Sequence, residues 1–198
     1  DAKCSTGHAQ SCSCLEAVKS VSWTLFSLQS LKYTAQNNLA MALGCQSPDF
    51  YDDAVGLYQA VLEGRNTLLN GDDNTDSIAT TNNMAWLLAR MGRGDEAIPL
   101  FTTVFEFRSR AYGPGHSSVL NAAQNLGVAL LRKGQLDEAR ERLLFVARGK
   151  IENMGQLHPS TQKALTFLVD CLRQSNDAGD TDGAVSVAEW ESKIIARS

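Results

Sequence analysis

The sequence predicts an all-α fold, a superhelical solenoid of antiparallel helix pairs with about three full repeats plus flanking helices. Residues 71–174 repeat with a period of 42, which places glycines in step at Gly71, Gly113 and Gly155. A fixed period in this range is typical of a solenoid. Small residues also recur twelve positions apart, as at Ala85 and Ala97, and such pairs allow two helices to cross closely.

The amino-terminal third contains a predicted tail and a first helix pair. Residues 1–14 are small and polar, so we expect a flexible, Cys-containing tail. From Leu15 the apolar residues follow a helical period, and one long helix or two abutting helices should run to Leu43. Residues 44–49 contain Gly and Pro and should end this stretch, and a second helix should occupy residues 50–69.

Two further helix pairs are expected, at 75–91 with 95–112 and at 117–133 with 137–154. Gly92 should supply the left-handed residue that closes the first of these helices. Another helix should begin around Pro159, because the missing N–H of proline is not needed in a first turn, and should run to about Arg173. Residues 175–198 should form a loop and a C-terminal capping helix, because a terminal repeat shows one face to water.

Composition argues against nucleic acid and membranes as partners. The 198 residues are 43% hydrophobic and 20% charged, with no apolar stretch near the ~20 residues that a bilayer requires. We therefore expect a soluble protein without direct membrane insertion. The net charge of -4 leaves no basic surplus to bind a polyphosphate backbone, so nucleic acid is not an expected partner.

The compartment is unknown from the sequence. The first residue is Asp rather than Met, which suggests processing or trimming. The cytoplasm is the default, and an organelle reached after removal of a presequence is the alternative. The odd count of five cysteines does not indicate a disulfide framework.

Three segments carry the repeat most clearly: TTNNMAWLLARMGRGDEAIPLF, NAAQNLGVALLRKGQLDEARERLL and GQLHPSTQKALTFLVDCL. Their order of small and large residues resembles the tetratricopeptide repeat, and the 42-residue unit looks like the kinesin light chain subtype of that repeat. The resemblance covers residues 32–174 well. It implies a tetratricopeptide-like repeat domain at 15–174, right-handed, with a concave surface made by the first helix of each pair.

The resemblance also implies which residues line that concave, partner-binding surface. They are Asn37, Met41, Asn82, Trp86, Arg90, Gln124, Val128, Arg132 and Asp170. Trp86 would anchor a partner, as aromatic residues do in hot spots, or would pack against its own neighbouring helix. Arg90 and Arg132 would grip acidic groups, or would only neutralise the carbonyl ends of their helices. The amides of Asn37 and Asn82 would bond a peptide backbone, or would fasten adjacent helices.

No catalytic residue, metal site or cofactor is predicted. His116 and His158 occupy equivalent positions and are expected to serve helix entry by hydrogen bonding. No Ser or Cys has the surroundings of a nucleophile such as G-x-S-x-G. The tail cysteines lack the two separated pairs of a zinc site. A lumenal disulfide from Cys4 to Cys12 or to Cys14 is about as plausible as zinc, and an unconstrained tail is favoured over both.

The expected function is a non-enzymatic protein–protein interaction module or scaffold that binds a partner segment through the concave groove or the helix faces. The alternative is a permanent structural or accessory subunit of a larger multiprotein complex, organellar or membrane-associated. In that case partners would cover exposed aromatic residues, with candidates at Trp23, Phe26, Phe105, Phe107 and Trp190. A carboxylate clamp for chaperone tails is not expected, because Met41, Trp86 and Val128 stand where that variant of the family has Asn.

Overall fold

The computed structural model of the chain describes residues 7–69 and 75–177, with side chains from 27 to 67 and from 75 to 175. The predicted capping helix, Trp190 and the first six residues lie outside this part of the chain. Two compact units are present, residues 1–77 and 78–198, and each is described by itself. All regular structure in the described residues is helical, and the predicted all-α solenoid of antiparallel helix pairs is confirmed.

The first unit is a helical hairpin of α1 (Gly7–Gln46) and α2 (Tyr51–Leu69), joined by a short 3₁₀ turn (Pro48–Phe50). Ala40 and Ala54 are fully buried, as expected of the small residues at a close helix crossing. Gly64 of α2 lies against the ring of Tyr33 of α1, and a Cβ at this position would collide with that ring. The sequence had left open one helix or two before Leu43, and the structure has one.

The amino-terminal boundary differs from the prediction. Residues 7–14 were expected in a flexible tail, but α1 already begins at Gly7. Between that residue and Gly44 there is no Gly or Pro to stop a helix. Extending an existing helix by one residue is far cheaper than nucleating a new one, so a polar stretch without breakers continues the helix.

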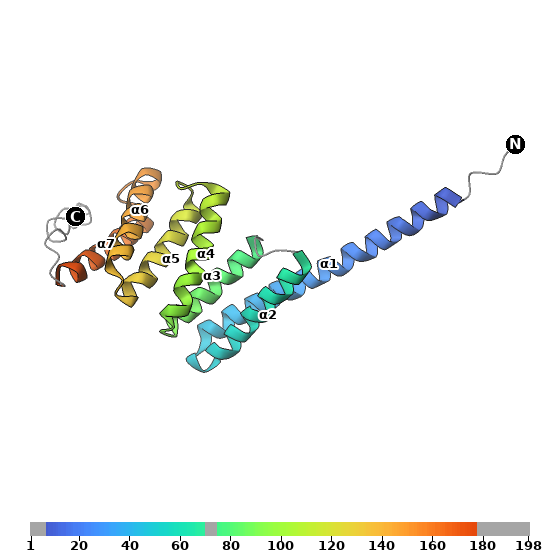
Figure 1. Cartoon of the computed structure of the whole chain (residues 1–198), viewed down its shortest axis with the longest axis horizontal. Coiled ribbons are helices and arrows are strands. Elements are labelled where there is room, and N and C mark those ends of the chain that lie inside the picture. The colour runs from blue at the N-terminus through green and yellow to red at the C-terminus, as the bar shows by residue number, and fades with distance from the viewer. Residues whose placement is uncertain (1–6, 70–74, 178–198) are drawn as a thin grey trace. The chain divides into compact units, whose positions relative to one another are not determined.

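The second unit takes in α3 (Thr75–Arg90) from Ile78 onward, α4 (Gly94–Tyr112), α5 (Ser117–Lys133), α6 (Leu136–Met154) and α7 (Pro159–Asp177). Figure 1 shows α4 to α7 following one another in order, each packed on the next. These bounds agree with the predicted ones to within one residue, except that α7 continues beyond Arg173. Gly92 and Gly134 close the tight turns with φ of 76° and 81°, a region that favours glycine.

The core repeats with the sequence. One cluster joins Ile78, Val104 and Ala122, and the next joins Ala123, Val146 and Ala164. Val104 and Val146 are 42 positions apart, as are Ala122 and Ala164. Equivalent positions therefore build successive layers of one continuous core, which is how a repeat that cannot bury its apolar face alone becomes stable.

Both predicted helix-entry histidines are confirmed. Nδ1 of His116 accepts a hydrogen bond from the backbone N–H of Ser118 at 3.1 Å, and Nδ1 of His158 accepts one from Ser160 at 3.1 Å. Each ring therefore satisfies one of the N–H groups that a helix leaves without a partner in its first turn.

A basic residue near the end of each second helix holds the first turn of the next helix. Arg65 donates to the carbonyl oxygen of Asp76 at 2.6 Å, and Arg108 donates to that of Ser118 at 3.4 Å. Lys150 donates to the hydroxyl of Ser160 at 2.9 Å. Asp76, Ser118 and Ser160 are spaced by 42, so the same tie recurs in every repeat.

Two aromatic residues predicted on the outer surface are partly covered by the core. Phe105 and Phe107 are partly buried and pack against the core clusters. Phe105 meets Phe145 edge to face, with ring centroids 6.3 Å apart, a favourable arrangement for two aromatic rings. The core therefore covers part of each ring, and only the remaining part is accessible to a partner. The side chains of Trp23 and Phe26 lie outside the described residues.

Candidate functional site

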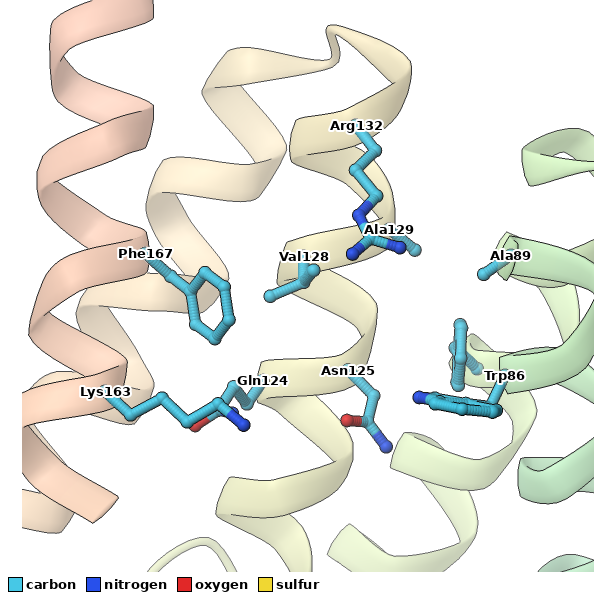
Figure 2. Close-up of a pocket in the computed structure, with 10 residues that line it drawn as sticks. Trp86, Ala89, Gln124, Asn125, Val128, Ala129, Arg132, Lys163 and Phe167 are labelled. Atoms are coloured by element: carbon cyan, nitrogen blue, oxygen red, sulfur yellow. The ribbon is translucent and has the colours of Figure 1, made fainter. Parts of the chain in front are cut away.

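A hollow of about 170 Å³ opens between the first helices of the second unit. Its walls come from α3, α5 and α7, and α4 contributes at one side (Figure 2). Figure 2 shows Trp86 on one side and Phe167 on the other, with the α5 side chains between them. The lining residues are Trp86, Ala89, Phe101, Gln124, Asn125, Val128, Ala129, Arg132, Lys163 and Phe167.

Helical spacing explains why these residues meet. On α5, Gln124, Val128 and Arg132 are four positions apart and so form one stripe along the helix. The opposite face of α5 is apolar and buried in the two core clusters. Burial of that face turns the stripe outward. Lys163 and Phe167 of α7 are also four apart and bring a cation and a ring to the same hollow.

Trp86 is the most exposed aromatic residue of this wall, with 46% of its surface accessible. The guanidinium carbon of Arg90 lies 4.8 Å from the centre of the indole ring, within the range of a cation–π interaction. The ring is therefore partly packed against its own neighbours and partly accessible. Its exposed part is available to a ligand while Arg90 supports the ring.

Two side-chain amides of α5 are oriented by hydrogen bonds. The Nζ of Lys150 donates to Oε1 of Gln124 at 2.7 Å, so the oxygen of this amide is engaged and its NH₂ group is left for other partners. The Nδ2 of Asn125 donates to Oδ1 of Asn82 at 3.1 Å. This second bond ties α5 to α3, which is the fastening role considered for Asn82 in the sequence.

The charge in this hollow is positive. Arg132 and Lys163 line it, and no carboxylate does. Neither cation forms a salt bridge with another residue in the described part of the chain. Burial lowers the pKa of Lys150, and the neighbouring charge of Lys163 lowers it further. A chain with a net charge of -4 thus carries a local basic site.

A second, more open hollow of about 470 Å³ continues along α5 and α7. It shares Val128, Arg132 and Phe167 with the first hollow and adds Leu131, Asp170, Arg173 and Gln174. Together the two hollows, called the groove below, extend along α5 from Gln124 to Arg132 and along α7 from Lys163 to Gln174. An open path of this kind suits an extended chain better than a compact small molecule, which needs an enclosed cavity.

The structure brings five of the nine predicted residues to the groove: Trp86, Gln124, Val128, Arg132 and Asp170. Arg90 stacks on Trp86, and Asn82 bonds to Asn125 instead of lining either hollow. Asn37 and Met41 belong to the first unit, where Met41 is half exposed and Oδ1 of Asn37 is buried without a hydrogen-bond partner among the described residues.

Sequence reasoning missed Lys163, Phe167 and Lys150. The prediction used the same helix face in every repeat, which for α7 selects Asp170. Asp170 lines only the second hollow, and the wall of the first hollow uses the part of α7 that carries Lys163 and Phe167. Lys150 lies on a second helix, and only its repeat-equivalence to Arg108 could have drawn attention to it.

The described residues show no cluster of three or more His, Cys, Asp or Glu side chains that could hold a metal ion. The sulfur atoms of Cys4, Cys12 and Cys14 lie outside the described side chains. Among the described helices, none combines the length and apolarity needed to cross a bilayer.

Comparison with known proteins agrees with this architecture. Residues 76–144 match the model of the tetratricopeptide repeat family. A crystal structure of nearly identical TPR-like repeats of the kinesin light chain kind from Podosopora anserina is similar, with 20% identity, a TM-score of 0.68, and coverage of 95% of this chain and 88% of that one. A substituted form of the same repeats gives 19% identity and a TM-score of 0.67, with coverage of 93% and 88%.

A more distant similarity is to BtubC (BKLC) from P. vanneervenii, at 13% identity and a TM-score of 0.54, covering 87% of this chain and 73% of that one. At these identities the solved structures establish a shared fold alone. No curated protein sequence matches the chain.

Proposed function

Because residues 76–144 match the model of the tetratricopeptide repeat family, we propose that this chain is a non-enzymatic interaction module that holds an extended segment of a protein partner in the groove. The repeat fold supports the general role of a protein-binding scaffold, because stacked helix pairs create a continuous surface. In this proposal the binding surface is the groove, on one face of the second unit.

The exposed indole of Trp86 carries the proposal. A large aromatic ring that is half accessible and supported by an Arg has the chemistry of an interface hot spot. Phe167 faces the same hollow from α7. Two rings on opposite walls suit an apolar side chain of the partner between them.

The charges define the rest of the segment. Arg132 and Lys163 are cations without salt bridges within the described residues, and no acidic residue lines the first hollow. Charge complementarity therefore favours a segment with acidic side chains beside its apolar anchor. A nucleic acid is disfavoured, because two groove cations on an acidic chain do not form the extended basic surface that a polyphosphate requires.

A permanent subunit of a larger complex is the second candidate, and one observation favours it. Leu28, Leu31 and Leu39 of α1 are all exposed. A group of large apolar side chains in water is typical of a surface that a partner covers. This role would use the first unit, through the face of α1 that carries these three leucines.

The test is peptide binding to the whole chain. An array of terminally blocked peptides, with and without acidic residues around an apolar anchor, selects ligands, and calorimetry then measures their affinity. Trp86→Ala should weaken binding at least about tenfold, since hot-spot truncations cost ~2 kcal/mol or more, with little change in melting temperature.

Tyr112→Ala is the matched control, because Tyr112 is also 46% exposed but lies outside the groove. It should leave affinity unchanged. If no peptide binds, or if both variants weaken binding equally, the groove is not the binding surface. Binding that instead depends on Leu28 and Leu31 would favour the subunit role.

A further inference from the structure

Lys150 is the one fully enclosed lysine among the described side chains, with 2% of its surface exposed. Its ammonium group bonds two neutral atoms, Oε1 of Gln124 at 2.7 Å and Oγ of Ser160 at 2.9 Å. Within the described residues it has no carboxylate partner. A buried charge without a counter-charge destabilises a fold, so its presence needs a reason.

The hydrogen bond from Lys150 to the next helix does not by itself explain why a cation is buried here. In the first repeat the same tie is made by Arg65, which has Asp76 as an acidic neighbour at 3.9 Å. In the second and third repeats the equivalents of Asp76 are Ser118 and Ser160, so Arg108 and Lys150 both lack this counter-charge, and of the two only Lys150 is fully enclosed. The third repeat therefore encloses a cation that has no acidic neighbour. The Lys150 ammonium also bonds Gln124, which lines the groove.

Lys150 decides what that lining residue offers. By taking Oε1 of Gln124, it leaves the amide NH₂ as the group that can meet a ligand. Gln124 and Lys163, which both line the first hollow, then act as hydrogen-bond donors, whereas Asn125 uses its Nδ2 for Asn82 and keeps its Oδ1 as an acceptor. The donors of Gln124 and Lys163 beside a buried positive charge suit an anionic acceptor, whose charge an amide ligand lacks.

We propose that Lys150 is a positioning residue that makes the groove select a carboxylate side chain of the bound segment over the corresponding amide. It does so through Gln124, because Lys150 is too enclosed to touch the segment itself. This inference depends on the proposed function, since it specifies one contact made by the segment in that groove.

The test compares matched peptides. For each blocked peptide that binds, every Asp or Glu is replaced in turn by Asn or Gln, and calorimetry at low salt measures the ratio of acid to amide affinity. The unmodified chain should prefer the acid at one position by about tenfold, the usual size of a hydrogen bond to a charged group. Lys150→Met should reduce this ratio to near one, while Lys150→Arg should retain most of it.

A second variant protects the test against a simple loss of folding. Gln124→Glu places a carboxylate beside the Lys150 ammonium, so it should raise the melting temperature while abolishing the acid preference. A purely structural role for Lys150 predicts an unchanged ratio in Lys150→Met, whereas a carboxylate at position 124 repels an acidic ligand in either case. An unchanged ratio in Lys150→Met therefore overturns the inference, whatever the result for Gln124→Glu.

The two proposals fail in different ways. If no peptide binds in a manner that depends on Trp86, the proposed function fails and this inference fails with it. If binding depends on Trp86 but the acid-to-amide ratio does not respond to Lys150 or Gln124, only this inference is wrong. A ratio that responds instead to Arg132→Gln alone assigns the selectivity to that surface cation, and also overturns it.

Discussion

Gly127 is the position at which enlarging a side chain should be most informative about the packing of α5 on α6. A Cβ added there would lie 3.0 Å from both Cγ and Cδ2 of Leu143, and 3.4 Å from Cβ of Arg142. Carbon atoms prefer separations of about 3.5–4.0 Å. Leu143 is fully buried and cannot turn away into solvent, so the helices themselves must separate.

The size of the effect follows from two opposing contributions. Replacing glycine by alanine within a helix stabilises it by about 1 kcal/mol, and at Gly127 the close contact with Leu143 should cancel most of this gain. Leucine adds three further carbons to the same space, and overpacking of this kind costs ~1–3 kcal/mol. Gly127→Leu should therefore lower the melting temperature, by about 2–4 °C for each kcal/mol in a chain of this size.

Gly56 provides the matched control. It lies in the middle of α2, and nothing lies within 4 Å of a Cβ added there. Gly56→Ala should therefore show the uncancelled helix gain of about 1 kcal/mol. Urea unfolding followed by circular dichroism at 222 nm measures all three variants. A Gly127→Leu variant as stable as the original chain would refute the close crossing of α5 and α6.

Three further predictions concern capping, ionisation and surface charge. His158→Ala should lower the free energy of unfolding by about 1 kcal/mol through loss of the cap on Ser160, and His158→Asn, which can cap, should restore most of it in the same urea assay. Burial, with a smaller contribution from the charge of Cys45, raises the pKa of Tyr58 to about 12 from 10.0. Between these two values the folded chain keeps the Tyr58 proton while the unfolded chain loses it, so this contribution to stability is complete below pH 10 and falls as the pH rises towards 12. Ultraviolet titration measures the pKa of Tyr58. Unfolding of Tyr58→Phe at the same pH values should lack the fall in stability. Asp95→Asn should change stability by less than about 1 kcal/mol, because its ion pair with Lys133 is largely exposed. A loss of more than this amount that persists at high salt would contradict the prediction.

The repeat period predicted the elements well because helix ends in this chain are set locally. The predicted range 117–133 coincides with α5 (Ser117–Lys133). His116 caps the start of that helix and Gly134 caps its end, and both residues can be recognised in the sequence. The failure at residues 7–14 has a related cause, because composition predicted disorder where no breaker was present to end α1.

The site was predicted only in part. Trp86 and Arg132 were found because they occupy a repeated face of the first helices, and periodicity reports such faces. Lys163 and Phe167 were missed, because the flank of α7 that meets the groove depends on how that helix is rotated against α5. A rotation of one position along a helix exchanges one set of wall residues for another.

By itself, then, the amino-acid order determined the helix pairs, their spacing and the faces they bury, because periodicity, caps and glycines act over a few neighbouring residues. Only the tertiary structure decided which polar groups meet. Lys150 bonds Gln124 across 26 positions, and Asn125 bonds Asn82 across 43. Contacts between such distant residues depend on how whole helices approach and rotate, and they set the charge and hydrogen-bonding character of the groove.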